Sequence, residues 1–178
     1  MFLRNLDCKQ IFRRTSGDVN FYRGWSEYKD GFGVAPGDFW LGNEAIYNLT
    51  RRHKYELRVD MKVKGEDLFA HYSLFRLHDE SDGYRVVLGT HFGTLGQLSP
   101  GFGMSSSDRQ KFSTRDRDND LLSHTNCAAR YHGAGWFKGC SSVNLNGKLG
   151  AKDIQGVFWA TGRETLYPDT IEMKIRRL

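Results

Sequence analysis

The chain has 178 residues, 39% hydrophobic and 26% charged, which fits one globular domain with a core of its own. No apolar run approaches the length needed to cross a bilayer, so the composition argues against a membrane-embedded protein. The formal net charge is +5, but basic and acidic residues alternate along the chain, which disfavours a nucleic-acid groove and leaves attraction to acidic glycans open.

The first twelve residues lack the basic region, long apolar stretch and small-residue cleavage site of a secretory signal. The cysteines and the sequon described below favour a fragment of a longer secreted product, so we interpret residues 1–12 as a divergent or truncated N-terminal segment. A cytosolic chain is the alternative at this point.

Two short helices are expected next. Ser26 is the expected N-cap of a helix that ends within residues 31–33, and Asn43 of a second helix with Ile46 and Leu49 on one face. Asn48 lies in this second helix and begins the sequon Asn-Leu-Thr, which predicts a glycan at Asn48 if the protein is secreted.

The clearest strand signal is a run of residues that alternate with charged ones, namely Tyr55, Leu57, Val59 and Met61. Weaker patterns predict strands within residues 68–77 and 84–88, joined by an acidic turn at 79–83. Ile171, Met173 and Ile175 predict a returning strand within residues 171–178. The fold class is therefore α+β, with a central antiparallel sheet and few short helices.

Between residues 89 and 169 the periodic signals fade into glycine, serine, asparagine and aspartate. A long irregular stretch in a compact domain is uncommon unless it is functional and held by other means. An aspartate run and a cysteine pair lie inside this stretch, so we expect a loop-rich C-terminal region that carries the function.

The aspartate run consists of Asp116, Asp118 and Asp120, and carboxylates spaced two apart can converge on calcium. An EF-hand is excluded, because its sixth and twelfth positions would be Leu121 and Cys127 in place of glycine and glutamate. The alternative is that the carboxylates only solvate a loop. A metal hydrolase is a further alternative, but no sequence motif of catalysis supports it, so we expect no enzyme.

Three cysteines are present, and Cys127 and Cys140 are close enough in sequence to bridge a compact loop. Closing a loop of this size would stabilise the fold by about 3 kcal/mol in the chain-entropy model. Cys8 is then unpaired. Three reduced, buried thiols are the alternative.

Seven segments together resemble the fibrinogen C-terminal globular domain family, as found in ficolins, tachylectins, tenascins and angiopoietins. They are residues 17–25 (GDVNFYRGW), 39–44 (FWLGNE), 55–60 (YELRVD), 112–120 (FSTRDRDND), 126–128 (NCA), 144–147 (NLNG) and 172–176 (EMKIR). The resemblance implies a domain over 13–178, with a sheet-containing part at 13–110, a calcium- and ligand-binding loop region at 111–170, and a returning strand at 171–178.

The resemblance also implies the site residues. The calcium ligands would be the side chains of Asp118 and Asp120 and the carbonyls of Leu122 and His124. The ligand-binding residues would be Tyr131, Gly139, Cys140 and Ser141, around a pocket for acetyl groups. In ficolins and tachylectins a cis peptide precedes the second cysteine, a histidine follows it and aromatic rings wall the pocket; here Ser141 replaces the histidine and Asp153 falls near one ring.

These features predict an extracellular, non-catalytic recognition module that is stabilised by calcium. It would bind glycans or acetylated groups in innate recognition and oligomerise through regions outside this chain, without nucleic acid or membrane insertion. The alternative is a protein-binding ligand or matrix-adhesion module of tenascin or angiopoietin type with a cell-surface receptor, which the departures at Ser141 and Asp153 favour.

Overall fold

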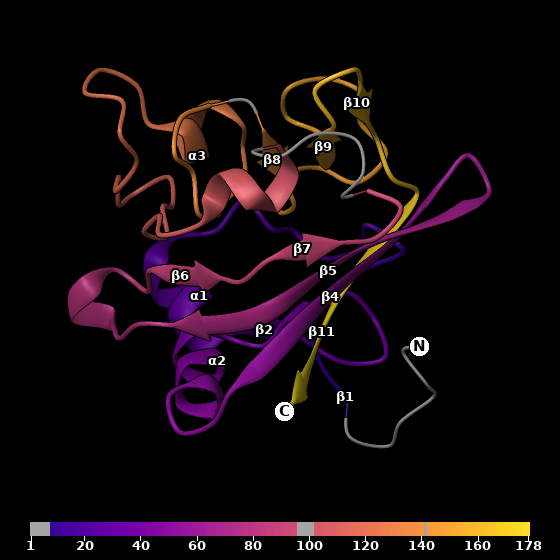
Figure 1. Cartoon of the computed structure of the whole chain (residues 1–178). Helices are drawn as coiled ribbons and strands as arrows, with labels where there is room; N and C mark the ends of the chain where they lie inside the picture. Colours follow the sequence, from indigo (N-terminus) through magenta and orange to yellow (C-terminus); the bar gives the residue numbers. More distant parts are fainter. Residues whose placement is uncertain (1–7, 96–101, 141) are drawn as a thin grey trace.

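Within the described residues, 8–95, 102–140 and 142–178, the computed structural model places eight strands in one antiparallel sheet (Figure 1). The order across the sheet is β2-β3-β1-β11-β4-β5-β6, and β7 pairs with β5. The strands are β1 (Cys8–Arg14), β2 (Phe32–Gly33), β3 (Phe39–Trp40), β4 (Tyr55–Val63), β5 (Glu66–Leu77), β6 (Val86–Leu88), β7 (His91–Phe92) and β11 (Thr170–Arg177). The predicted α+β class and its antiparallel sheet are confirmed.

The strands predicted by alternation form the centre of the sheet. In β4 the side chains of Leu57, Val59 and Met61 are buried, and in β11 those of Ile171, Met173 and Ile175. β11 lies between β1 and β4. Its pairing with β4 runs from Thr170 opposite Lys62 to Arg177 opposite Tyr55. Its pairing with β1 runs from Ile171 opposite Arg14 to Arg176 opposite Cys8. The period-two pattern thus identified the best-paired strands.

β1 brings residues 8–12 into the sheet, where the sequence analysis expected a divergent segment. Its register with β11 shifts between Gln10 and Phe12, and the consecutive residues Ile11 and Phe12 are both fully buried. A bulge of this kind breaks the alternation of faces. The strand therefore carries no period-two signal.

Helix α1 (Trp25–Asp30) follows Gly24 as its N-cap, so the prediction that Ser26 caps it is wrong. The backbone N–H of Trp25 donates instead to the carboxylate of Asp116, at 3.0 Å to Oδ1 and 3.2 Å to Oδ2. A side chain 91 residues away thus satisfies one of the free N–H groups at the helix start.

Helix α2 (Asn43–Thr50) begins one residue earlier than predicted, with Gly42 as its N-cap and Asn43 inside the helix. Ile46 is fully buried and Leu49 packs against the core, so the predicted apolar face is confirmed. Gly42 has φ 104°, in the left-handed region that glycine adopts without strain.

The C-terminal region contains short elements joined by loops, and in Figure 1 it lies along the edge of the sheet near β6 and β7. The short helices are η1 (Glu80–Asp82), at the predicted acidic turn, η2 (Gly103–Ser107) and α3 (Cys127–Arg130). The second sheet has the order β10-β9-β8, with β8 (Val143–Asn144), β9 (Phe158–Ala160) and β10 (Thr165–Leu166).

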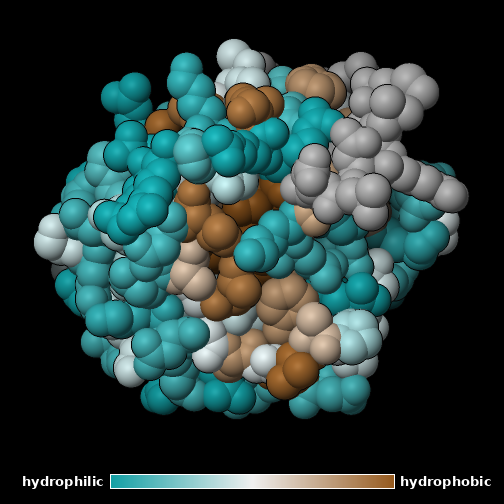
Figure 2. Space-filling view, turned by 90° about the horizontal axis from the view of Figure 1, so that it is seen from below, coloured by the Kyte–Doolittle hydropathy of each residue, from teal (hydrophilic) through white to brown (hydrophobic). Residues whose placement is uncertain are grey.

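Trp136 attaches this loop region to the sheet. It is 4% exposed, its ring centroid lies 5.1 Å from that of Phe112 and 6.0 Å from that of Trp40, and its indole N–H donates to the carbonyl of Tyr84 at 2.9 Å. Trp136 therefore belongs to the main core. The opposite side, seen from below, shows a hollow apolar strip between polar flanks (Figure 2).

Candidate functional site

The three aspartates of the run 116–120 have different surroundings. Asp116 accepts hydrogen bonds from the N–H of Trp25 and, at 2.7 Å, from the hydroxyl of Thr114. Burial alone would raise the pKa of Asp116, but these hydrogen bonds outweigh it and hold the pKa below its ordinary value. Asp116 is therefore a structural acceptor at the start of α1, which leaves Asp118 and Asp120 for a cation.

Asp118 and Asp120 lie side by side in the loop that leads to α3. Asp118 Oδ1 accepts from the N–H of Asp120 at 3.1 Å, and Asp120 accepts from the N–H groups of Leu122 and Cys127, both at 2.8 Å. Burial raises the pKa of Asp118, and the negative charge of Asp120 raises it further. Two carboxylates that repel each other in this way are stabilised by a positive charge placed close to both.

The donors around this pair fit calcium. Each oxygen of Asp120 accepts one N–H and keeps a further lone pair, and Asp118 is exposed. In the part of the chain that the structure describes, the carbonyls of Leu122 and His124 accept no hydrogen bond. Hard oxygen ligands in an irregular loop are what calcium takes. These four residues could therefore hold the ion as the sequence predicts.

The disulfide between Cys127 and Cys140 is present, with a Cα–Cα distance of 5.2 Å, so its prediction is confirmed. A carboxylate oxygen of Asp120 and both sulfur atoms lie within 4.8 Å of one another. The sulfur atoms are bonded to each other and offer no thiolate to a metal. The bridge instead fixes the loop next to the carboxylates, while Cys8 is a free, half-buried thiol.

Tyr131 lies beneath the disulfide in a small apolar cluster. It is 5% exposed and packs edge-on against Phe137 and Phe158, with ring centroids 6.0 and 5.4 Å away. Burial raises the pKa of its phenol. The structure thus gives Tyr131 the surroundings of a packing residue.

Gly139 and Cys140 line an open hollow of about 640 Å³, which we call the disulfide depression. Its lining combines residues of three segments: Ser105, Ser106, Asp108, Gln110, Leu121, Leu122, Lys138, Gly139, Cys140 and Ser142. Leu122 is a predicted calcium ligand through its carbonyl and also lines the depression. The cation loop and the hollow therefore share a residue.

The remaining predicted pocket features are not gathered there. Ser141 lies outside the described residues. Asp153 is exposed in another loop, where it accepts from the N–H of Gln155 at 2.8 Å. Within the described residues the cis peptide bond is Ala35–Pro36, and Gly139–Cys140 is trans.

Sequence reasoning missed the contribution of η2 to this depression. Ser105 and Ser106 reach it from a segment more than thirty residues before the disulfide's second cysteine, and no local pattern marks them. Asn48 is exposed on α2, where its amide donates to Glu44 at 3.0 Å. Its glycosylation stays a prediction.

The sequence of the chain is similar to those of known proteins. A family model described as "Fibrinogen beta and gamma chains, C-terminal globular domain" matches residues 8–178. Tenascin-R of Mus musculus is 41% identical over 167 residues, covering 92% of this chain and 12% of tenascin-R. Ficolin-3 of Homo sapiens is 39% identical over 161 residues, covering 88% of this chain and 52% of ficolin-3. The chain thus spans a small part of one relative and about half of the other.

Two solved structures share the fold. The fibrinogen-like globe domain of human ANGPTL6 has a TM-score of 0.85 and 38% identity, covering 95% of this chain and 77% of that one. The fibrin D-dimer of lamprey, complexed with the peptide ligand Gly-His-Arg-Pro-amide, has a TM-score of 0.82 and 31% identity, covering 94% of this chain and 60% of that one. No helix in the described ranges is long and apolar enough to cross a membrane.

Proposed function

Because the chain belongs to the fibrinogen C-terminal globular domain family, we propose that it is an extracellular, non-catalytic recognition module that binds glycans or acetylated groups in the disulfide depression. The observation that carries the proposal is the placement of this hollow. It opens beside a covalently fixed loop and takes its lining from residues on both sides of the cation loop. Most of the residues that line it are polar, and side chains of serine, aspartate, glutamine and lysine can hydrogen-bond the hydroxyl and amide groups of a sugar.

Calcium is part of this proposal. Bound between Asp118 and Asp120, the ion would supply the positive charge that the two carboxylates lack. The N–H of Leu122 is held by Asp120 at 2.8 Å, and the N–H of Leu121 donates to the carbonyl of Lys138 at 3.1 Å. The carboxylates thus fix the segment that forms one wall of the depression, so ligand binding should depend on the cation.

Retention on acetylated resin tests the proposal. The calcium-loaded domain should bind the resin and be released by N-acetylglucosamine, and Lys138→Glu should reduce retention because Lys138 lines the depression. Lys152→Glu is the matched control, since Lys152 is an exposed lysine elsewhere. If the wild type flows through where a ficolin-like control is retained, recognition of acetylated groups in the disulfide depression is excluded.

A protein-binding or matrix-adhesion role is the second candidate, and two observations favour it. Tyr131 is buried and leaves the depression without an open aromatic wall, and the lamprey fibrin relative is a complex with a peptide ligand. Capture of a cell-surface protein that N-acetylglucosamine does not displace would support this role over the first.

A further inference from the structure

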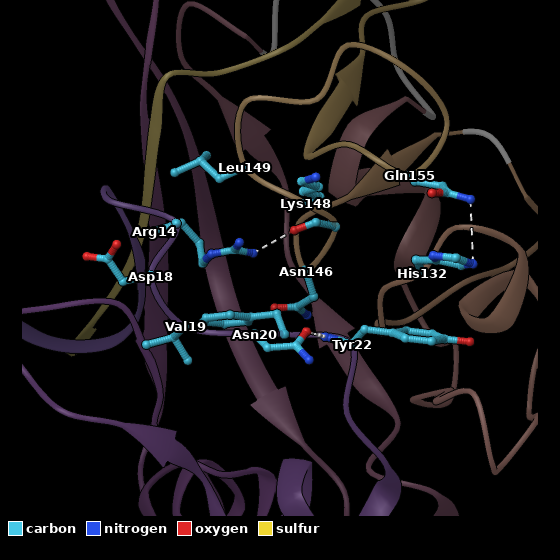
Figure 3. Close-up of a pocket in the computed structure, with 13 residues that line it drawn as sticks. Arg14, Asp18, Val19, Asn20, Tyr22, His132, Asn146, Lys148, Leu149 and Gln155 are labelled. Carbon is cyan, nitrogen blue, oxygen red and sulfur yellow. Dashed lines mark hydrogen bonds between the residues drawn. The ribbon is translucent and has the colours of Figure 1, made fainter.

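Arg14 is buried and paired, although a hollow of about 450 Å³ opens beside it between residues 17–22 and 146–155 (Figure 3). We call this hollow the Arg14 groove. Arg14 is 2% exposed, its Nε lies 3.6 Å from a carboxylate oxygen of Asp38, and its Nη1 donates to the carbonyl of Gly147 at 2.8 Å. The charge of Arg14 is thus neutralised inside the protein, and the free positive charge of the chain lies elsewhere.

A group of unpaired basic side chains gathers at one end of the large sheet. The turn of residues 51–54, which follows α2, reads Arg-Arg-His-Lys, and all four side chains are exposed. The fold adds two exposed arginines from distant parts of the chain. We call the whole set the basic end, and it consists of Arg51, Arg52, His53, Lys54, Arg76 and Arg177.

Strand pairing brings these segments together. The N–H of Leu178 donates to the carbonyl of Lys54 at 3.0 Å, and Arg177 pairs with Tyr55 in the sheet. On its other side, Tyr55 pairs with the residue that precedes Arg76. Because adjacent strands are about 4.8 Å apart, the backbones of Arg76 and Arg177 lie about 10 Å apart, on either side of the start of β4. Figure 1 shows the loop after α2 and the C-terminus at the same end of the sheet.

No carboxylate forms an ion pair with the basic end within the described residues. The neighbouring part of the sheet differs. There Arg58 and Lys174 both contact Asp60, and Lys62 contacts Asp67. Cations and carboxylates thus balance each other along the middle of the strands, whereas the cations at the basic end are left to solvent.

The charge of the basic end equals the excess charge of the whole chain. The chain has 26 lysines and arginines and 21 aspartates and glutamates, so without the five lysines and arginines of the basic end the two numbers would be equal. Glu56, the next acid along β4, is buried against His71 and Arg176, and the carboxylate of Leu178 offsets one of the five charges. The remaining charge creates a field that attracts an anionic partner to this end of the molecule.

The backbone under the basic end is held in place. The hydroxyl of Thr50, at the end of α2, donates to the carbonyl of Ile46 at 2.9 Å and accepts from the N–H of Leu77 at 3.2 Å. The N–H of Arg51 donates to the carbonyl of Tyr47 at 2.9 Å, and the guanidinium of Arg51 lies 5.6 Å from the centroid of the Tyr47 ring. The charged side chains therefore project from fixed positions, so binding costs little backbone entropy.

The chemistry of the basic end favours one class of partner. Four of its five permanent cations are arginines, and a guanidinium can pair with two oxygens of a phosphate at once. Sulfate has the same tetrahedral arrangement of oxygens. β4, β5 and β11 are paired on both sides, so they leave no strand edge to which a peptide could add. Outside the cell, where we place the protein, polymers that repeat such groups are sulfated polysaccharides.

We propose that the basic end binds a sulfated glycosaminoglycan, a linear polysaccharide whose successive sulfate groups pair with the turn of residues 51–54 and with the flanking Arg76 and Arg177. None of these residues lines the disulfide depression, so the two surfaces are separate. The proposal rests on the extracellular location proposed above and not on a ligand in the depression. Failure to bind acetylated resin would therefore leave it unaffected.

Titration calorimetry with a heparin oligosaccharide at physiological ionic strength tests this surface. A hyaluronan oligosaccharide of equal length, which has carboxylates but no sulfate, should bind at least about tenfold more weakly because it has fewer anionic groups to pair. Protein without an N-glycan is used, since Asn48 is exposed one turn before Arg52. Added salt should weaken heparin binding, because ions screen exposed charges.

Two single variants from distant segments test whether the segments act together. Arg52→Gln and Arg177→Gln should each weaken heparin binding about fivefold, the upper end for one exposed ion pair, and the double variant about 25-fold. Arg163→Gln is the matched control, because Arg163 is an exposed arginine next to β10 and outside the basic end. All variants should melt with the wild type, since the replaced side chains are exposed and form no ion pair.

Four outcomes would overturn the proposal. The first two are equal affinity of the wild type for heparin and hyaluronan, and unchanged heparin affinity in the folded double variant. The third is an effect of Arg163→Gln as large as that of Arg52→Gln, which would mean that heparin senses only the net charge. The fourth is tighter binding of a polyglutamate peptide or of single-stranded DNA than of heparin.

Discussion

Asp38→Asn should strongly destabilise the domain. The carboxylate of Asp38 accepts from the N–H groups of Thr15, Ser16 and Gly17 and lies beside the buried guanidinium of Arg14. An amide nitrogen in place of Oδ2 would face the N–H of Gly17 and leave Arg14 without a counter-charge. Removing one partner of a buried ion pair costs about 3–5 kcal/mol.

Urea unfolding under non-reducing conditions measures this loss. With an m-value of about 2 kcal/mol per molar urea, the midpoint of Asp38→Asn should fall by about 1.5–2.5 M. Asp18→Asn, in an exposed residue of the same loop, is the matched control and should stay within about 0.5 kcal/mol of the wild type. The variant Arg14→Met with Asp38→Asn should be less destabilised than the sum of the single variants, since no unpaired charge remains.

A cost of less than about 1 kcal/mol for Asp38→Asn, well under the expected range for a broken buried pair, would refute a stabilising role of this ion pair. An equal effect of Asp18→Asn would refute it as well, because the loss would then come from the charge of the loop and not from the buried contact.

Three further predictions concern stability. Replacing Cys127 and Cys140 by alanine should lower the free energy of unfolding by about 3 kcal/mol in urea, and an unchanged midpoint would contradict the crosslink. Asp116→Ala should cost about 1–2 kcal/mol by the same assay, because α1 loses its distant acceptor; Asp153→Ala, exposed, is the control. The pKa values of Asp38 and Asp116 in the folded protein lie below their ordinary values. Their contribution to the free energy of unfolding should therefore be complete above the unfolded pKa of about 3.9 and be lost as the pH falls through the folded pKa values. A urea midpoint that rises on acidification would refute this.

The parts of the fold that the sequence predicted are those with regular local signals. The alternation in β4 and β11 arises because each strand has one buried and one solvent-exposed face. The spacing of the aspartates brings Asp118 and Asp120 together within a single loop. β1 was missed because its bulge buries Ile11 and Phe12 in succession.

The rest depends on contacts between distant segments. The start of α1 is set by Asp116 and not by its own serine, and the Arg14 groove joins residues more than a hundred positions apart. Such contacts leave no periodic trace in one sequence. A residue's neighbours in the chain predict its secondary structure better than they predict its partners.

The central place of β11 has a consequence for how the protein is made. β1 and β4 are separated in the sheet by a gap that only residues 170–177 fill, so translation must reach those codons before the two strands can be joined. Until then, a nascent chain would leave the backbone N–H and C=O groups along one edge of β1 and one edge of β4 unpaired. A premature stop that removes this last strand would delete the middle of the sheet, and chaperones should retain such a product.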